Sequence, residues 1–182
     1  MKKYSIILFL IFITSEALAE NKKEIIKNLK NTNNLSFNFE QNINGEIENG
    51  RCTIQYPKKI YCEYKSDDKK VLVSNGRSLV IKTSKSYYLY PLNKTPLNFI
   101  LNKDFLLKKI NYLNERIIDN KYINYSFVEN ENQINIFFDK KNYNLIGWQM
   151  LDIFQNQSIT YLYSIVKNQE VKKDLFKIPI QN

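Results

Sequence analysis

The stretch VLVSNGRSLVIKT, residues 71–83, carries the strongest structural signal in the sequence. Two runs rich in Val, Leu and Ile flank the dipeptide Asn75-Gly76. Asn and Gly tolerate the positive φ angles that a two-residue type I′ turn requires, so the pattern predicts a β-hairpin. A turn at these two positions pairs Leu72 with Leu79 on one face. The centre of the chain is therefore predicted to be antiparallel β-structure.

The same two-residue periodicity extends in both directions from this hairpin. Apolar and polar side chains alternate over residues 37–42, 52–56, 60–64 and 86–90. Beyond Asn114, strands separated by polar turns are predicted at 116–119, 122–129, 133–139, 145–153 and 157–166. About ten short strands with few helices indicate a mainly β protein, in which one large antiparallel sheet curls on itself.

Three segments break the alternation and are predicted to be helical. Residues 22–31 place aliphatic side chains at helical spacing, which indicates an amphipathic N-terminal helix. Thr95 and Pro96 favour a helix start, because a hydroxyl can cap a helix and proline suits its first turn. Another short helix is expected over residues 104–110. The helix that begins at Thr95 is expected to be a plug or lid over the concave side of the sheet.

The composition argues against most catalytic and metal-binding chemistry. The chain contains no histidine, which is the usual general base and the commonest metal ligand. Two cysteines without a histidine do not make a zinc site. Neither a glycine-rich phosphate loop nor a Gly-x-Ser-x-Gly elbow occurs. We therefore expect a protein that is not an enzyme, with no catalytic residues, no metal and no cofactor.

The charge of the chain is positive but dispersed. There are 27 basic and 18 acidic residues, which give a net charge of +9 at pH 7. The lysines are scattered singly or in pairs, without an arginine-rich run. Clustered basic residues are typical of nucleic-acid sites. The pattern indicates a solvated lysine surface, and no nucleic-acid partner is expected.

The first nineteen residues have the features of a cleavable export signal. Two lysines precede an apolar run over residues 6–13, and residues 17–19 are a small-x-small cleavage site. The run is too short to span a bilayer, which takes about 20 residues. Cleavage is expected between Ala19 and Glu20. Because Glu20 is not a cysteine, it cannot carry a lipoprotein anchor, so a soluble exported domain over residues 20–182 is expected.

Cys52 and Cys62 flank a second predicted hairpin, whose turn lies at residues 56–59. With a three-residue turn centred on Pro57, Cys52 lies directly opposite Cys62, and the Cβ atoms of such a pair can come within disulfide reach. An even cysteine count in an exported protein favours a bridge. Two buried thiols are the alternative, whereas a reactive thiol is disfavoured because no histidine can activate it.

The apolar positions of the predicted strands share the inner face of the curled sheet. This face is either an ordinary packed core or the wall of a cavity. Tyrosine, which occurs 13 times, suits a semi-wet wall because its ring is apolar and its tip is polar. The candidate wall residues are Phe37, Phe39, Ile54, Tyr64, Leu72, Leu79, Tyr90, Phe137, Trp148 and Met150.

Several short motifs follow one another along the chain after the export signal. They are Phe39-Glu40-Gln41, YPKKIYCEY at 56–64, VSNGRSL at 73–79, YPLNKTPL at 90–97, Leu145 to Trp148, Asp152, and LFKIP at 175–179. In order and spacing they resemble the LolA-type periplasmic carriers of outer-membrane lipoproteins. The resemblance covers nearly the whole of the expected mature chain.

The resemblance implies an unclosed β-barrel whose helices lid an apolar cavity, in a monomeric periplasmic protein. Carriers of this type take acylated lipoproteins from an inner-membrane lipoprotein-releasing ABC transporter and deliver them to an outer-membrane lipoprotein receptor. No catalytic residue is required, which agrees with the missing histidine. The expected lid residues are Thr95, Pro96, Leu97, Ile100 and Leu101.

One position departs from the family pattern. In many members, a basic residue precedes the proline of the turn at 56–59 and is thought to hold the lid by hydrogen bonds. Here that position is Tyr56. Its hydroxyl can donate one hydrogen bond, whereas Arg51 is expected to point to the other face. Because Tyr56 replaces the basic residue, the sequence does not establish that this position controls the lid as it is thought to do in other members.

Other functions remain as alternatives at this stage. A lipoprotein receptor or a lipid-binding sensor of the same fold is the nearest, although Glu20 argues against a lipid-anchored receptor and a sensor normally carries a second domain. A carboxylate-dependent periplasmic hydrolase would need two acidic residues on the concave face, where the predicted positions are nearly all apolar. A structural adhesion module would have a filled core without a cavity.

Overall fold

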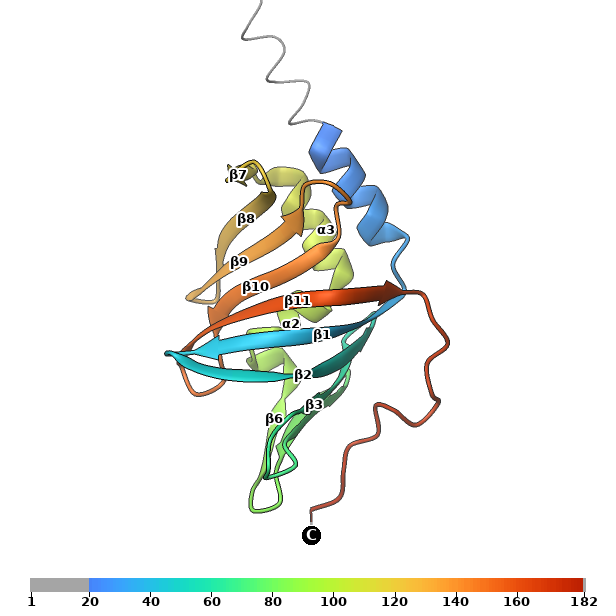
Figure 1. Cartoon of the computed structure of the whole chain (residues 1–182), viewed down its shortest axis with the longest axis vertical. Coiled ribbons are helices and arrows are strands. Elements are labelled where there is room, and N and C mark those ends of the chain that lie inside the picture. The colour runs from blue at the N-terminus through green and yellow to red at the C-terminus, as the bar shows by residue number, and fades with distance from the viewer. Residues whose placement is uncertain (1–19, 182) are drawn as a thin grey trace, which may run out of the picture.

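The computed structural model describes residues 20–181, which form one antiparallel sheet of eleven strands with helices on its concave side (Figure 1). The strands are β1 (Asn34–Ile43), β2 (Glu46–Gln55), β3 (Lys59–Tyr64), β4 (Val71–Asn75), β5 (Ser78–Lys82), β6 (Tyr87–Pro91), β7 (Arg116–Ile118), β8 (Tyr122–Glu129), β9 (Asn132–Asp139), β10 (Leu145–Leu151) and β11 (Gln157–Lys167). The helical elements are a helix over residues 20–30, the 3-10 turn η1 (Leu92–Lys94), α2 (Leu97–Leu101) and α3 (Lys103–Tyr112).

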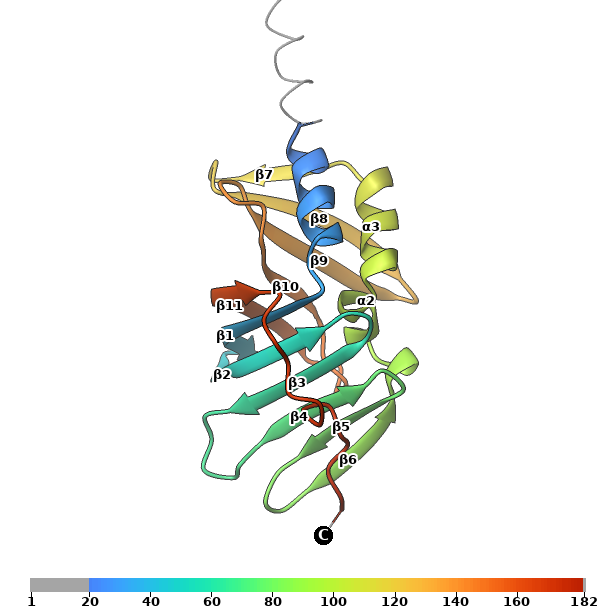
Figure 2. The same cartoon turned by 90° about the vertical axis from the view of Figure 1, so that its right-hand side faces the viewer.

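The strand order is β6-β5-β4-β3-β2-β1-β11-β10-β9-β8-β7, and the two end strands do not pair with each other. The chain between β6 and β7 forms η1, α2 and α3 instead of a strand that could close the barrel. Figures 1 and 2 show the sheet curving around α2 and α3, with the N-terminal helix beside α3. The predicted mainly β, unclosed barrel is confirmed, with eleven strands in place of about ten.

The hairpin β4–β5 forms as predicted, but its register differs from the prediction. Leu72 lies opposite Ile81, so Leu79 is a diagonal neighbour instead of its direct partner. The turn consists of Gly76, at a φ of +98°, and the residue after it. Asn75 stays in the strand, and its side chain accepts hydrogen bonds from the two backbone N–H groups that follow Gly76. The turn therefore lies one residue later, and the parity that puts both leucines on one face is preserved.

The hairpin β2–β3 has the register that was predicted. Gln55 pairs with Lys59, so the turn contains three residues centred on Pro57. Cys52 therefore lies directly opposite Cys62. Both sulfur atoms belong to the inner face of the sheet.

Alternation along the strands separates a buried inner face from an outer face. In β1, β8 and β9, runs of every second side chain are buried, as the period of two requires. The helices complete the core with Ile25 and Leu29 from the N-terminal helix and with Leu106 and Ile110 from α3. Burying each such side chain contributes about 1.5–3 kcal/mol. The packing of these aliphatic side chains holds both helices against the concave face.

Polar contacts fix the N-terminal helix beside the end of α3. The Asn21 amide donates to the Glu115 carboxylate at 2.8 Å, and the Lys22 ammonium donates to the Leu113 carbonyl oxygen at 2.8 Å. The helix is described over residues 20–30, close to the predicted 22–31.

The predicted signal peptide, residues 1–19, lies outside the described residues, and so does Ala19 on the N-terminal side of the predicted cleavage site. Glu20 is exposed at the start of the described helix. Within residues 20–181, no helix is both long enough and apolar enough to cross a membrane.

The segment after β11 crosses the outer face of the sheet over β3–β5 (Figure 2). Phe176 is buried there, and the Lys59 ammonium lies 5.9 Å from its ring centroid. Val73 and Val80 pair across β4 and β5 with the opposite parity to Leu72, and both are buried. The closing segment thus covers a small apolar patch on the outer face, separate from the main core.

Candidate functional site

A cavity of about 270 Å³ lies between the concave face of the sheet and the start of α2. Its walls come from β1 to β5, from β10 and β11, and from the loop that joins the last two strands. Most of the lining side chains are apolar. Six of the ten predicted wall residues line this cavity, namely Phe39, Tyr64, Leu72, Leu79, Trp148 and Met150.

Three other predicted wall residues lie near the cavity without lining it. Phe37 and Ile54 are buried in the core, where the Phe37 ring meets the Trp148 ring edge to face with centroids 6.4 Å apart. Tyr90 lies opposite Leu79 on the edge strand β6 and is half-buried. Phe37 and Ile54 lie on the same inner face as the lining residues and pack in the core beside the cavity.

Phe137 lies on the outer face, contrary to the prediction. It pairs with Gly147 and Asn124, whereas the buried inner positions of β9 are those of Ile136 and Phe138. Two consecutive phenylalanines leave the parity of this strand ambiguous in the sequence. The buried aliphatic positions before them decide it, because a strand cannot direct adjacent side chains to the same face.

The predicted lid residues divide between the cavity and the core. Pro96 and Leu97 line the cavity. Ile100 and Leu101 are fully buried, at 0% exposure, and belong to the core. Thr95 does not cap α2, because its hydroxyl donates to a backbone carbonyl of η1 at 2.8 Å and Pro96 occupies the cap position. Only the first turn of α2 therefore covers the cavity.

The link between α2 and the β2–β3 turn runs through the main chain. The backbone N–H of Lys58 donates to the carbonyl oxygen of Leu101 at 2.9 Å. Tyr56 is buried, and its hydroxyl has no hydrogen-bond partner among the residues described. Burial raises the pKa of the Tyr56 hydroxyl. The Lys103 ammonium lies 5.7 Å from the centroid of the Tyr56 ring. Tyr56 thus contributes ring packing here, and not the hydrogen bond considered from the sequence.

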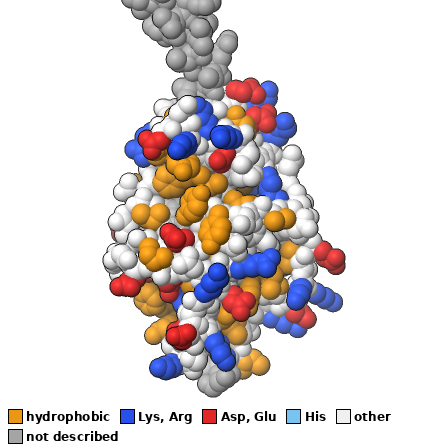
Figure 3. Space-filling model, in the orientation of Figure 1, with side chains coloured by type: hydrophobic (Ala, Val, Ile, Leu, Met, Phe, Trp, Pro, Cys, Tyr) orange, Lys and Arg blue, Asp and Glu red, His pale blue; other side chains and the backbone are white. Residues whose placement is uncertain are grey.

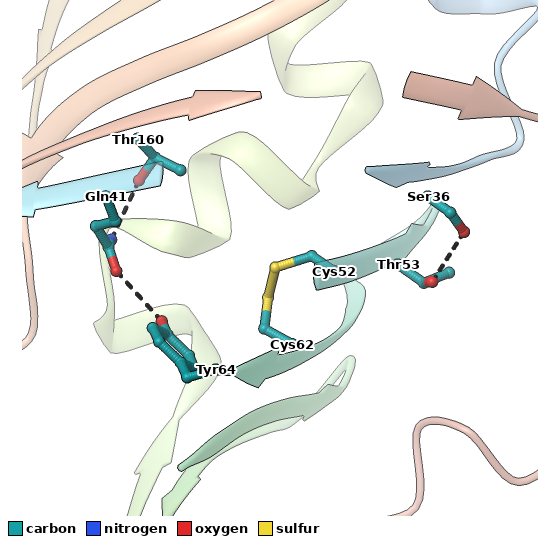
Figure 4. Close-up of a disulfide and its surroundings, with 7 residues drawn as sticks. All are labelled: Ser36, Gln41, Cys52, Thr53, Cys62, Tyr64 and Thr160. Carbon is teal, nitrogen blue, oxygen red and sulfur yellow. Dashed lines mark hydrogen bonds between the residues drawn. A yellow bond between two sulfur atoms is a disulfide. The ribbon is translucent and has the colours of Figure 1, made fainter. Parts of the chain in front are cut away.

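Cys52 and Cys62 form a disulfide in the wall of the cavity (Figure 4). Their Cα atoms are 4.1 Å apart, and they are separated by ten positions in the sequence. The bridge joins β2 to β3 on the inner face. It adds polarisable, uncharged surface to the lining.

The mouth of the cavity combines aromatic and charged side chains. Phe154, in the loop between β10 and β11, meets Tyr88 of β6 edge to face with ring centroids 5.9 Å apart. Lys70 forms an ion pair with Glu48 at 2.6 Å, and its ammonium lies 4.3 Å from the ring centroid of Tyr64. Burial, together with the nearby carboxylates, raises the pKa of Tyr64, which keeps its hydroxyl neutral. The contact between Phe154 and Tyr88 brings the loop after β10 to the edge strand β6, across the open side of the barrel.

Gln41, Ser158 and Thr160 are polar residues of the lining that form a cluster and were not selected from the sequence. Gln41 donates from Nε2 to Ser158 at 2.8 Å and to Thr160 at 3.1 Å, and it accepts from the Tyr64 hydroxyl at 3.3 Å. The alternation of side chains along β1 and β11 could have identified these three residues as inward-facing. Gln41 has the same parity as Phe39, and the two hydroxyl residues have the same parity as the buried Leu162.

The described residues offer little for acid–base or metal chemistry. Within residues 20–181, no three Cys, Asp or Glu side chains gather to hold a metal ion. Asp152 is the one carboxylate among the described residues that line the cavity. The cavity therefore presents apolar surface and hydrogen-bonding groups, without a pair of carboxylates.

The outer face of the sheet carries its own apolar side chains. Figure 3 shows hydrophobic groups gathered over β9, β10 and β11 on this face. Tyr161 and Tyr163 are substantially exposed there, and their rings stack with centroids 6.5 Å apart. These side chains lie on the opposite side of the sheet from the cavity.

Comparison with known proteins identifies the family. The sequence model of one protein family, described as outer membrane lipoprotein carrier protein LolA, matches residues 30–179 of this chain. The chain belongs to the LolA family. None of the curated protein sequences matches the chain. The LolA match spans the sheet, α2, α3 and the closing segment, so it includes every element that lines the cavity.

Several solved structures resemble this LolA-family chain. An uncharacterized conserved protein from Thermus thermophilus has a TM-score of 0.52 at 8% identity, covering 88% of this chain and 94% of that one. LprF from Mycobacterium bovis has a TM-score of 0.48 at 15% identity, covering 87% and 97%. A LolA superfamily protein from Nitrosomonas europaea has a TM-score of 0.45 at 8% identity, covering 88% and 97%. At 8% identity, the similarity to the Thermus thermophilus protein shows that the two chains share a fold and nothing more. Lipid or lipoprotein binding in general is supported by the family.

Proposed function

We propose that this protein is a periplasmic carrier that shields the acyl chains of lipoproteins between the inner and the outer membrane. The observation that carries the proposal is the apolar cavity between the concave sheet and the first turn of α2. Membership of the LolA family supports it. The export signal expected in residues 1–19 would place the protein in the compartment where such a carrier acts.

The physical task sets the requirement for the site. Exposing an acyl chain to water costs about 0.8 kcal/mol per methylene, so one long chain costs on the order of 10 kcal/mol. A carrier must supply comparable apolar contact and still release its cargo. The lining residues Leu72, Leu79, Leu97 and Met150 offer such contact. Carrying a lipoprotein requires binding and release but no change in covalent bonds, so a cavity without a carboxylate pair is sufficient.

The cavity must open to accept an acylated protein. Its volume of about 270 Å³ lies just below the range of about 300–1,000 Å³ typical of small-molecule pockets. The element best placed to move is the first turn of α2, because α2 has only five residues and no side-chain cap. The C-terminal end of α2 is held by the hydrogen bond from the Lys58 backbone N–H to the Leu101 carbonyl oxygen and by the buried side chain of Leu101. We infer that Leu97 swings away while Leu101 stays in place.

The proposal implies two protein partners besides the cargo. An inner-membrane lipoprotein-releasing ABC transporter would load the carrier, and an outer-membrane lipoprotein receptor would unload it. Exposed lysines near the mouth of the cavity are candidates for contact with either partner. The proposed carrier is expected to work as a monomer.

The test is depletion of the protein in cells, followed by separation of the inner and outer membranes. Under the proposal, lipoproteins destined for the outer membrane accumulate in the inner membrane. Complementation with Leu97→Asp should fail to restore sorting. Val128→Asp, which introduces the same charge at a highly exposed position, should restore it. Normal lipoprotein sorting after depletion would refute the carrier function.

A second arm separates the carrier from the same-fold receptor. The protein is isolated from the periplasmic fraction under native conditions and its bound proteins are identified by mass spectrometry. A carrier is recovered from the periplasm with acylated lipoproteins attached. Recovery of the protein only with the outer membrane would favour the receptor.

A further inference from the structure

A polar cluster interrupts the otherwise apolar wall of the cavity. It consists of Gln41 on β1, Tyr64 on β3, and Ser158 and Thr160 on β11. Thr160 lies directly opposite Gln41, and Ser158 is the next inward position of β11. Figure 4 shows the Gln41 side chain between those of Thr160 and Tyr64. Ser158 and Thr160 are buried, at 1% and 5% exposure.

The hydrogen bonds of the cluster leave two donors unused. The Gln41 amide has two N–H groups, and it donates to Ser158 Oγ and to Thr160 Oγ1. Both hydroxyl oxygens are therefore acceptors in these contacts, and each retains its own O–H proton. The Tyr64 hydroxyl uses its proton on Gln41 Oε1. Among residues 20–181, the structure shows no hydrogen bond donated by the hydroxyl group of Ser158 or of Thr160.

The position of these two hydroxyls suits one class of ligand. They lie in the same cavity as the apolar side chains of Leu79 and Leu97. Through Gln41 and Tyr64 they are connected to Lys70 at the mouth. An amphiphile whose chain fills the apolar part would bring the head of that chain to this end. Buried donors without acceptors are unfavourable, so the site favours a ligand with a carbonyl oxygen at that point.

We propose that Ser158 and Thr160 donate hydrogen bonds to the carbonyl oxygen of an acyl ester or amide, and so fix the depth at which an acyl chain is held. This inference rests on the proposed function, because it concerns the head of the same acyl chain. It adds a chemical criterion: the site distinguishes an acyl group from an alkyl group of equal length. Gln41 is the positioning residue, because it holds both hydroxyl oxygens in place.

The test compares two glycerolipids that differ in one carbonyl group. The probes are 1-palmitoylglycerol and 1-O-hexadecylglycerol, each measured by displacement of the fluorescent probe N-phenyl-1-naphthylamine from the purified protein. We expect the wild-type protein to bind the ester about tenfold more tightly than the ether, an effect of the size of one or two net hydrogen bonds. In Ser158→Ala/Thr160→Val the ratio should fall to about one, through loss of ester affinity with ether affinity unchanged.

A matched control is available on the outer face. Ser36 and Thr53 form a hydroxyl pair at 2.9 Å between β1 and β2, away from the cavity (Figure 4). Ser36→Ala/Thr53→Val removes the same atoms and should leave the ester-to-ether ratio at its wild-type value. An unchanged ratio in the cavity double variant would overturn the proposal.

A measurement on the wild-type protein alone guards against a variant that does not fold. Infrared spectroscopy of bound 1-palmitoylglycerol with a ¹³C-labelled carbonyl should show the C=O band at lower frequency than in hexane. A band at the hexane position would refute the hydrogen bonds. If ester and ether bind equally, the inference fails while lipid binding stands; if neither displaces the fluorescent probe, the proposed function fails too.

The source of the acyl group is a separate arm of the same assay. A diacylglyceryl-cysteine peptide and a phosphatidylglycerol with the same chains are compared, each against its ether analogue. Dependence on the carbonyl with the lipopeptide supports recognition of lipoprotein acyl groups. Dependence with both supports recognition of acyl esters in general, and dependence with neither overturns the proposal.

Discussion

Phe39 and Tyr64 meet edge to face across β2, with ring centroids 5.0 Å apart and an interplanar angle of 76°. Gly50 lies between them, paired with both residues on the neighbouring strands. A Cβ atom at Gly50 would come within 2.3 Å of the Glu63 carbonyl oxygen and 2.7 Å of the Phe39 ring. The missing side chain therefore allows two aromatic side chains of the cavity wall to touch.

We predict that Gly50→Ala destabilises the protein by about 1–3 kcal/mol, because the added methyl group overpacks the inner face. The free energy of unfolding from urea denaturation provides the measurement. Asn49→Ala, one residue earlier and on the opposite face, adds no atoms and serves as the control. Equal stability of the Gly50 variant and the wild-type protein would contradict the close approach.

Leu97 and Leu101 should respond differently to the same charge. Leu97→Asp is expected to abolish binding of N-phenyl-1-naphthylamine and to cost less stability than Leu101→Asp, because the Leu97 side chain is buried but borders the cavity. Leu101→Asp buries an unpaired charge in the core and should cost about 3–5 kcal/mol of stability. Fluorescence titration and circular dichroism separate the two effects. Equal loss of folding in both variants would favour a filled core over a cavity.

The Cys52–Cys62 bridge should contribute about 2–3 kcal/mol to stability, because it closes a short loop of the unfolded chain. The double variant Cys52→Ala/Cys62→Ala is compared with the oxidised wild-type protein by urea denaturation. Reduction of the wild-type protein should produce a similar loss. Maleimide labelling of the denatured, unreduced protein is expected to modify no thiol, and two labels per chain would refute the bridge.

Tyr56→Phe should leave stability unchanged or increase it by about 1–3 kcal/mol, because the hydroxyl is buried without a partner among the described residues. Thermal denaturation at neutral pH is the measurement, and Tyr125→Phe is a useful contrast. The Tyr125 hydroxyl donates to the Glu115 carboxylate at 3.1 Å, so its loss should destabilise. A destabilised Tyr56 variant would show that its hydroxyl does bind a partner.

Stability should fall in alkaline solution. Burial raises the pKa of Tyr56, Tyr64 and Tyr125 above the ordinary tyrosine value of about 10. Above pH 10 the unfolded chain therefore binds fewer protons than the folded protein, and the free energy of unfolding decreases as pH rises. Below that pH these groups contribute no slope. The urea midpoint between pH 8 and 11 measures the effect, and Tyr56→Phe should lose less stability; an unchanged midpoint would contradict it.

The strands could be predicted from the sequence because a period of two and turn-forming residues are local properties. The positions of the eleven strands, the face shared by Leu72 and Leu79, and the register of Cys52 against Cys62 all depend on short segments. The predicted register of β4–β5 was wrong because Asn75 is the last residue of β4 and not part of the turn. Its side chain accepts hydrogen bonds from the two backbone N–H groups after Gly76 and so stabilises a turn one residue later. Phe137 was misplaced because two adjacent aromatic residues fit either parity.

The candidate site could be predicted less fully for a related reason. Alternation identifies inward side chains but does not say which of them border empty space. Ile54 and Leu101 face inward and belong to the core, whereas Leu97, on the same helix as Leu101, lines the cavity. That distinction depends on how far the sheet curls and where α2 docks, which no short segment encodes.

The sequence by itself determined the secondary structure, the apolar inner face and the opposition of the two cysteines, since each follows from the local backbone period. Only the tertiary structure decided that Gln41 meets Ser158 and Thr160, which lie 117 and 119 positions away. It also decided that the backbone of Lys58 holds α2 through Leu101. Such contacts depend on pairing between β1 and β11 and on helix docking, and both are fixed by packing of the whole chain.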